Sequence, residues 1–452
     1  MRHTIAVSDI HLCEVERTDG LWMRYRQARF SPDDDLATML DTVRSKVSAT
    51  PGDELCLVLN GDIFDFDAPR VVEGESVFHD LPRTAENAVP AIGAILDDHP
   101  AFIAALGRVL ADGHEVVFVS GNHDVLLTLP EVRAVVEGRL LAAAGSAVAR
   151  SRIVFRAWFH LTPDGILLEH GHQYDGYCAH RYPMVPFGLD RREIHPTMGS
   201  LTTRNLVSRM GFFNPHVDGS YMLSALGYLG HWARYYLFSR HSLMFAYARG
   251  AARTLTQLVQ RRFPGTRSRR LENVLAAARE TGTRLRQVVR HARLYDTPAE
   301  DRLRTVIREF WVDRIALLGL TVVLGLVFFL AAHGPLMAGA AVVPALFVTY
   351  ELSVPKPPLD ETWRRVQRAA RRVARVYKAR AVVFGHTHQP AGEWVEGVFY
   401  GNTGTWSPAF KDLECTQPIA EKRPVVWLKS DGPTGTMTGG LLMWNGAEIV
   451  EA

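Results

Sequence analysis

Four of five short polar motifs in this chain follow apolar runs that read as β-strands, and this pattern constrains the fold more than any other feature. The strand-like runs are residues 5–8, 55–60, 116–120, 153–159 and 166–169, with helix-like segments near 34–47, 101–112 and 131–144. Apolar strands among helices predict an α/β fold with a sheet covered on both sides. The motifs are Asp9-Ile10-His11, Gly61-Asp62-Ile63-Phe64-Asp65, Gly121-Asn122-His123-Asp124, Glu169-His170-Gly171-His172 and Gly385-His386-Thr387-His388.

The five motifs supply carboxylate, amide and imidazole groups, and no thiolate motif accompanies them. Oxygen donors stabilise a cation and neutral imidazole binds Mn, Fe or Zn, so the set suits a divalent transition ion. Ligands at the carboxyl ends of strands lie where α/β folds place their sites. Asp9 and His11 are two residues apart and point to the same side of an extended segment, as do His386 and His388. The sequence therefore predicts a metal cluster.

Two ions about 3.5 to 4 Å apart need a shared ligand, and a carboxylate with two oxygens suits that position. Asp62 is our candidate for this bridge. His170 and His172 end the same strand, and we favour His170 as the ligand because Gly171 lets the backbone turn tightly beside an ion. Asp65 is interpreted either as an acceptor behind the ligands or as a helix cap.

This arrangement resembles the calcineurin-like metallophosphoesterases, whose five motifs it matches in order from residue 9 to residue 388. The resemblance implies a two-sheet sandwich flanked by helices that binds two divalent ions, Mn in the first place and Fe or Zn otherwise. It also implies how the ligands divide between the ions. One ion would be held by Asp9, His11, Asp62 and His388, and the other by Asp62, Asn122, His170 and His386.

The same resemblance implies a mechanism, in which a hydroxide between the ions attacks phosphorus in line. By motif position, His123 would protonate or stabilise the leaving oxygen, and Asp124 would orient the imidazole of His123. Within the superfamily the chain is most similar to the branch of the UDP-2,3-diacylglucosamine pyrophosphatases, through His170, Gly171 and Asp175. Those enzymes usually carry Arg in the position of His123, so His123 favours phosphomonoester or diester cleavage.

The alternation of strands and helices stops after residue 172 and resumes at residues 381–384, followed by short strands at 398–400, 425–428 and 441–444. We therefore expect a catalytic domain formed by residues 1–172 and 381–452. Residues 173–380 are expected to form a long, mostly helical insertion between the fourth and fifth motifs. The resemblance does not cover this insertion.

The insertion combines aromatic, cationic and apolar segments. Residues 210–248 carry ten aromatic residues, which suit a bilayer interface, a groove for acyl chains or an ordinary aromatic core. Basic helices are expected near 249–263 and 269–293, and residues 249–293 have a net charge of +10. Residues 363–380 contribute a further +8, so the rest of a chain whose total is +3 must be acidic.

Residues 315–354 form an apolar stretch that we expect to be a membrane-inserted hairpin. Its first leg, residues 315–332, has 18 residues without a charge, and at 1.5 Å per residue it spans about 27 Å, close to the thickness of a hydrocarbon core. A buried helical hairpin is the alternative. The basic amphipathic helix expected at 363–378 would then contact anionic lipid headgroups.

Residues 1–6 lead straight into the first expected strand, so we expect no signal peptide before it, and the four scattered cysteines favour a reducing compartment. We expect a catalytic domain on the cytoplasmic side of a membrane. The expected function is dinuclear metal-dependent hydrolysis of a phosphoester or pyrophosphate bond in a lipid-linked or other amphiphilic phosphate. The alternative is a soluble phosphoesterase acting on nucleotides, phosphoproteins or nucleic acid. Of these three substrates, nucleic acid is the one that we favour least. An inactive scaffold is disfavoured because every expected ligand is present.

Overall fold

The computed structural model gives the positions of most of the expected catalytic domain and of part of the expected insertion. Between residues 312 and 353 it describes only isolated helical residues, so most of the apolar stretch 315–354, like residues 208–242 of the aromatic segment, lies outside the described residues. The described ranges are 1–15, 32–73, 75–77, 81–145, 149–180, 193–207, 243–260, 267–309, 359–408 and 422–452.

The larger of two main sheets has seven strands in the order β14-β13-β12-β1-β2-β5-β6. Strands β1, β2, β5 and β6 run parallel to one another. Strands β12, β13 and β14 join the sheet through antiparallel pairs, the first of which links β12 to β1. The bounds are β1 (Arg2–Val7), β2 (Glu54–Asn60), β5 (Glu115–Val119), β6 (Ile153–Arg156), β12 (Arg423–Ser430), β13 (Met437–Trp444) and β14 (Ile449–Glu451).

The smaller main sheet has five strands in the order β10-β11-β9-β8-β7, and it joins residues from both sides of the expected insertion. Strands β8 and β9 are parallel neighbours although some two hundred residues separate them. Its bounds are β7 (Phe159–Leu161), β8 (Ile166–Glu169), β9 (Ala381–Phe384), β10 (Ala391–Val395) and β11 (Val398–Asn402). A separate hairpin consists of β3 (Arg70–Val72) and β4 (Glu75–Val77).

The two sheets pack face to face because alternate side chains of each strand enter different layers. In β1, Ala6 packs between the sheets, whereas Ile5 and Val7 pack against the outer helices of the larger sheet. Val58 of β2 and Val383 of β9 meet in the layer between the sheets. Strands buried on both faces explain the continuous apolar runs in the sequence.

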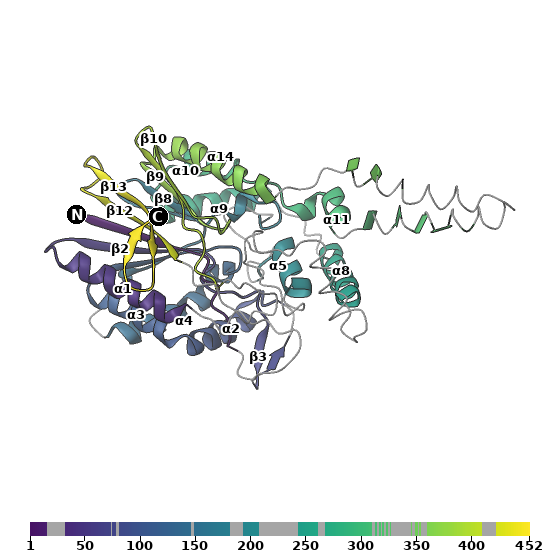
Figure 1. The fold of residues 1–452 in the computed structure, drawn as a ribbon, viewed down its shortest axis with the longest axis horizontal. Helices are drawn as coiled ribbons and strands as arrows, with labels where there is room; N and C mark the ends of the chain where they lie inside the picture. Colours follow the sequence, from purple (N-terminus) through teal and green to yellow (C-terminus); the bar gives the residue numbers. More distant parts are fainter. Residues whose placement is uncertain are drawn as a thin grey trace.

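Helices cover the outer face of each sheet, so the protein has four layers (Figure 1). The larger sheet is covered by α1 (Asp33–Ser48), α2 (Ala85–Asp98), α3 (Pro100–Ala111) and α4 (Pro130–Ala144). The smaller sheet is covered by α9 (Arg267–Glu280), α10 (Leu285–Ala292) and α14 (Leu359–Tyr377). The expectation of an α/β architecture with two sheets and flanking helices is confirmed at this level.

Two details differ from the sequence-based expectations. Residues 153–159 do not form one strand, because the chain bends at Ala157 and Trp158 and passes from β6 at the edge of the larger sheet to β7 at the edge of the smaller one. The basic segment 269–293 is likewise not one helix, since residues 281–284 separate α9 from α10.

The described part of residues 173–380 is mainly helical. The amphipathic helix expected at 363–378 is present as α14, with Val366 and Val373 buried and its arginines exposed. Elements of this region not yet introduced are η4 (His172–Tyr174), α5 (Met198–Thr202), η5 (Thr203–Val207), α8 (Leu243–Gln260), η7 (Ala299–Asp301) and α11 (Leu303–Glu309).

Among the described residues, no single helix has both the length and the apolar composition to cross a membrane. The pair α2 and α3 passes that test jointly on composition, but the two helices meet at 88° and pack in the core beside the larger sheet. The expected hairpin at 315–354 falls mostly outside the described ranges, so it stays a prediction.

Candidate metal centre

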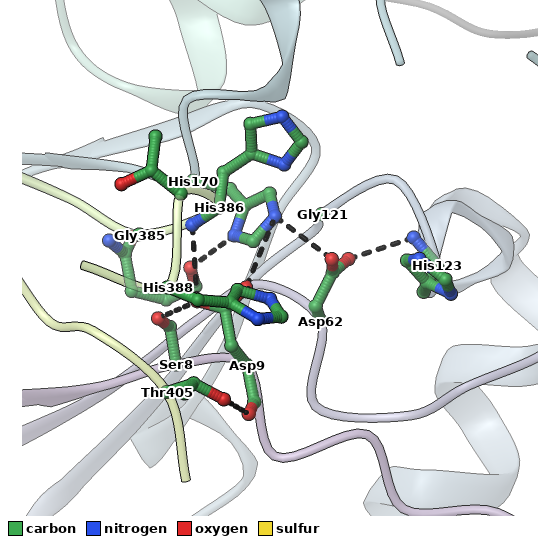
Figure 2. Close-up of polar contacts among 12 residues, drawn as sticks. Ser8, Asp9, Asp62, Gly121, His123, His170, Gly385, His386, His388 and Thr405 are labelled. Carbon is green, nitrogen blue, oxygen red and sulfur yellow. Dashed lines mark hydrogen bonds and ion pairs between the residues drawn. The ribbon is translucent and has the colours of Figure 1, made fainter. Parts of the chain in front are cut away.

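The polar motifs gather at one edge of the two-sheet core (Figure 2). Three of them follow strands of the larger sheet and two follow strands of the smaller one. Because these strands run parallel within each sheet, their carboxyl ends lie at the same edge. The strands and the expected site residues after them are β1 with Asp9 and His11, β2 with Asp62, β5 with Asn122 and His123, β8 with His170, and β9 with His386 and His388.

Five of the expected ligands have a left-handed backbone conformation, which non-glycine residues rarely adopt. The φ angles are +54° at Asp9, +56° at His11, +52° at Asp62, +66° at His386 and +56° at His388. Only eight non-glycine residues in the described ranges have positive φ, so most of them lie at this edge. Each such residue costs roughly 1–2 kcal/mol, and strain concentrated in this way is typical of functional sites.

The first group of potential ligands contains Asp9, His11 and His388. The Nε2 atom of His388 lies 3.1 Å from Oδ1 of Asp9, and Nε2 of His11 lies 4.0 Å from the same oxygen. One donor atom from each residue lies within 4.8 Å of the others. Atoms that share one ion at about 2.1 Å each are separated by roughly 3 to 4 Å, so the three side chains can hold a single cation.

The second group contains Asp62, His170 and His386, which also bring their donor atoms within 4.8 Å of one another. Nε2 of His170 is 3.1 Å from Oδ2 of Asp62 and 4.0 Å from Oδ1 of Asp9. Asp62 also belongs to a group with His11, so its carboxylate faces ligands of both groups. This position fits the expected role of Asp62 as a bridging ligand.

Oδ1 of Asn122, a buried oxygen atom at this edge, has no hydrogen-bond partner within the described ranges, and Oδ1 of Asp9 faces the Nε2 atoms of His388 at 3.1 Å and of His11 and His170 at 4.0 Å. A buried polar atom without a partner costs about 1–3 kcal/mol, and more if it is charged. Ligation of a cation would satisfy the oxygen of Asn122. The residues present therefore fit a divalent metal, and Asn122 lies where the sequence predicts it, directly after β5.

His170, and not His172, faces the carboxylates of the cluster. The Nδ1 atom of His170 lies 3.0 Å from the main-chain oxygen of Asn60, to which it donates when Nε2 is kept for a ligand. His172 stacks instead on Trp158, with ring centroids 5.4 Å apart, and contacts Gln173 through Nε2. His170 therefore stays the candidate ligand of this strand end.

Two glycines of the motifs leave room for ligand side chains. A Cβ atom added to Gly61 would lie 2.4 Å from the ring of His170, and Gly61 itself has a φ of +91°. A Cβ atom added to Gly121 would lie 2.2 Å from Oδ1 of Asp62. The glycines are therefore needed for close approach of the backbone to the cluster.

The charges of the cluster are coupled. Burial would raise the pKa of the Asp9 carboxyl, but the imidazoles of His170 and His388 outweigh burial and hold that pKa below its usual value. The pKa of Asp62 is held well below its usual value in the same way, by His170 and His123 against burial. Burial would lower the pKa of His170, but Asp62 and Asp9 raise it to about 9. Both carboxylates are thus ionised at neutral pH, and a cation competes with a proton for His170.

His123 has a different carboxylate partner from the one expected. Its Nδ1 donates to Oδ1 of Asp65 at 2.9 Å and lies 3.5 Å from Oδ2 of Asp67. The expectation that Asp124 orients His123 is corrected, because the Asp124 carboxylate accepts from the main-chain N–H groups of Gly121 at 2.6 Å and Ile63 at 2.8 Å. Asp124 therefore fixes the two motif loops.

Of the two interpretations left open for Asp65, the acceptor behind the ligands is the one seen, and the helix cap is wrong because the residues between β2 and β3 contain no helix. Besides His123, its Oδ1 atom accepts from the main-chain N–H groups of Asp67 and Ala68 at 2.9 and 3.1 Å. Burial lowers the pKa of His123, but Asp65, Asp62 and Asp67 together raise it well above its usual value. These carboxylates therefore favour the protonated form of the His123 imidazole, which can serve as an acid.

Two residues at the site were not among the expected site residues. Oδ2 of Asp175 lies 3.2 Å from Nε2 of His386, so this contact can fix the orientation of the ring while Nδ1 binds a metal ion. Asp175 was noted only as part of the fourth motif's resemblance. Arg204 of η5 is buried and donates from Nη2 to the main-chain oxygen of Phe66 at 3.0 Å, which brings the insertion close to His123. No local pattern marks Arg204 in the sequence.

Comparison of the chain with protein-family models and with curated proteins gave no match.

Proposed function

We propose that this protein is a metal-dependent hydrolase of phosphoester or pyrophosphate bonds, related to the calcineurin-like metallophosphoesterases. The observation that carries the proposal is the meeting of six potential ligands from four strand ends, drawn from both sheets, among which are the two buried carboxylates of Asp9 and Asp62. Mixed oxygen and imidazole donors support Mn, with Fe or Zn as the other candidates. The order of the five motifs supports the family assignment.

Two divalent cations are assigned to the two groups of the site. Asp9, His11 and His388 would hold one ion, and Asn122, His170 and His386 would hold the other, with Asp62 shared between them. Such a pair of ions would activate a water molecule and neutralise the negative charge of a phosphate group.

His123 is assigned the role of the acid that acts on the leaving oxygen. Its Nδ1 is held by Asp65, which fixes the orientation of the ring, and the proton would be donated from Nε2. The raised pKa favours the protonated ring, although cations bound beside Asp62 would act against that shift. The ring of His123 lies edge-on to that of His11 with centroids 4.8 Å apart, so the acid is close to the ligand groups.

We further propose that the substrate is an amphiphilic phosphate and that the protein associates with a membrane. Large apolar side chains are exposed at Leu320, Val322, Val323, Leu326 and Leu352, within the apolar stretch of the insertion. Exposed apolar residues gathered in one segment mark an interaction surface. The cationic face of α14 follows that segment in the chain and suits anionic headgroups.

The test of catalysis uses the purified full chain with Mn²⁺ and an aryl phosphate. Asp62→Asn keeps the shape of the side chain but removes the charge of the bridging candidate, so we expect hydrolysis to fall at least 100-fold. Asp35→Asn on the exposed side of α1 is the matched control and should leave the rate unchanged. Equal rates in wild-type and Asp62→Asn protein would exclude catalysis at this centre.

A further inference from the structure

A cavity of 420 Å³ lies between α14 and the strands β10 and β11, apart from the metal ligands. One wall is formed by α14, and the other by residues of β10 and β11 from Ala391 to Glu393 and from Tyr400 to Asn402. Its volume is within the range of about 300–1,000 Å³ that is usual for ligand pockets. The assignment of the metal centre leaves this cavity without a function.

Three arginines of α14 line the cavity, namely Arg364, Arg368 and Arg371. Their spacing of four and three residues puts them on one side of the helix. Glu393 is the one acidic residue of the lining, and it lies 3.3 Å from Nη2 of Arg371. The lining therefore carries two positive charges in excess, and all three arginine side chains are exposed to solvent.

The floor of the cavity is apolar. By the floor we mean the buried lining residues Val366 of α14 and Phe384 of β9, to which Trp363 and Tyr400 add aromatic rings. The guanidinium carbon of Arg371 lies 6.0 Å from the centre of the Tyr400 ring. A cationic rim over an apolar and aromatic floor suits a ligand with an anionic group joined to an apolar body.

The cavity adjoins the metal centre through the loop that carries its last two histidines. Asn402 lines the cavity, and its Nδ2 atom donates to the main-chain oxygen of Gly385 at 2.8 Å and to Oγ1 of Thr387 at 3.1 Å. Phe384 of the floor directly precedes Gly385. A ligand in this cavity would therefore lie next to the loop of His386 and His388 without occupying the ligand cluster.

The exposed apolar residues of the insertion identify the source of such a ligand. Leu320, Val322, Val323 and Leu326 each expose more than half of their surface, and Leu352 exposes 84%. Leu352 precedes the first residue of α14 by seven positions, so a lipid surface that takes up this segment would lie at the amino-terminal end of α14.

We propose that the cavity binds the phosphate headgroup of an anionic phospholipid, with Arg364 and Arg368 on the phosphate and the glycerol and first methylenes on the apolar floor. This inference takes the lipid setting from the proposed function but does not depend on hydrolysis. A bound headgroup would hold the metal centre against the membrane surface, where an amphiphilic substrate is concentrated.

The experiment measures binding of dihexanoyl phosphatidic acid, below its micellar concentration, to the full chain by isothermal titration calorimetry without added metal. The Arg364→Gln/Arg368→Gln variant should bind at least tenfold more weakly than wild type. Arg372→Gln/Arg375→Gln removes the same charge from exposed positions of α14 outside the cavity lining, and it should bind within twofold of wild type. Equal losses in both variants would overturn the proposal, as would wild-type affinity in the first.

Three further measurements complete the test. Ala391→Leu narrows the cavity without changing its charge and should also weaken binding at least tenfold. Asp62→Asn should bind the lipid as wild type does, so loss of catalysis and loss of headgroup binding are separate outcomes. Inorganic phosphate should bind at least tenfold more weakly than the lipid; equal affinity would assign the cavity to free phosphate and refute the lipid headgroup.

Discussion

Replacement of Gly121 by alanine tests the geometry around the bridging candidate without removing any ligand. The added Cβ atom would lie 2.2 Å from Oδ1 of Asp62 and 2.5 Å from the main-chain nitrogen of the same residue. Gly121 does not have a positive φ, so alanine introduces no backbone strain of that kind. The substitution therefore acts through contact with Asp62.

The size of the effect follows from these distances. Ordinary contacts of a Cβ atom begin at 3.4 Å, so the Asp62 carboxylate must retreat by about 1.2 Å, the gap between 2.2 and 3.4 Å. Movement of about 1 Å in a reacting arrangement costs on the order of 100-fold in rate, which corresponds to about 2.7 kcal/mol of activation free energy. We expect a loss of this size in Gly121→Ala, together with weaker binding of the second Mn²⁺ ion.

Calorimetric titration with Mn²⁺ and hydrolysis of an aryl phosphate are the two assays, and thermal unfolding checks that the variant is folded. Gly138→Ala is the matched control, because Gly138 lies in α4 and a Cβ atom there would meet no described atom within 4 Å. The control should keep its rate and gain up to about 1 kcal/mol of stability from helix propensity. A folded Gly121→Ala protein with wild-type metal affinity and rate would refute the reasoning.

Three other predictions concern the groups around the cluster. Asp65→Asn removes the charge that faces Nδ1 of His123, so the rate should fall about 10- to 100-fold. Because that charge raises the pKa of His123, the alkaline limb of the pH–rate profile should also move to lower pH. An alkaline limb at the wild-type pH would show that His123 is not the acid. The pKa of His170 is raised from 6.5 to about 9, so in metal-free protein this group contributes stability that is complete below pH 6.5 and is lost as the pH rises through about 9. As the pH rises through this range, the free energy of unfolding of chelator-treated protein in urea should fall while the affinity for Mn²⁺ increases. The prediction is contradicted if both quantities change in the same direction. Tyr174→Phe removes the hydroxyl that donates to buried Glu169 at 2.9 Å, and it should lower the free energy of unfolding by about 1–3 kcal/mol in urea melts, whereas no change would mean that this hydrogen bond is not needed.

The ligand cluster could be predicted from the sequence because each ligand is tied to its strand by covalent distance. Asp9 lies two residues after β1 and Asp62 lies two residues after β2, and parallel strands bring such positions to one edge. His170 follows β8 directly. Once a strand ends before a polar motif, the destination of the side chain is nearly fixed.

The partner of His123 could not be predicted in this way. Asp65 and Asp124 both lie near His123, and the sequence does not show which of the two carboxylates contacts the imidazole and which accepts from the main-chain N–H group of Gly121. Asp124 follows Gly121 by three residues and accepts from its N–H group, as a short polar side chain in a turn often does. Asp65 comes from another strand end, and this contact exists only after the sheet has formed.

Two features of the fold, helix α2 and the bend between β6 and β7, could also not be predicted from the sequence. Helix α2 contains Pro90, which disfavours a helix locally, but burial of Ile92 and Ile95 against the core stabilises it. The bend at Ala157 and Trp158 could not be predicted because residues on both sides of it are apolar and strand-like. In both cases packing against distant residues decides the structure.

The central claim is that two cations share Asp62 at the meeting point of both sheets. Electron paramagnetic resonance of the Mn²⁺-loaded protein measures this directly, because two ions bridged by one carboxylate are coupled in their spins. We predict a coupled spectrum at two Mn²⁺ per chain that is lost in Asp62→Asn. A spectrum of isolated Mn²⁺ at full loading, unchanged in Asp62→Asn, would contradict the claim.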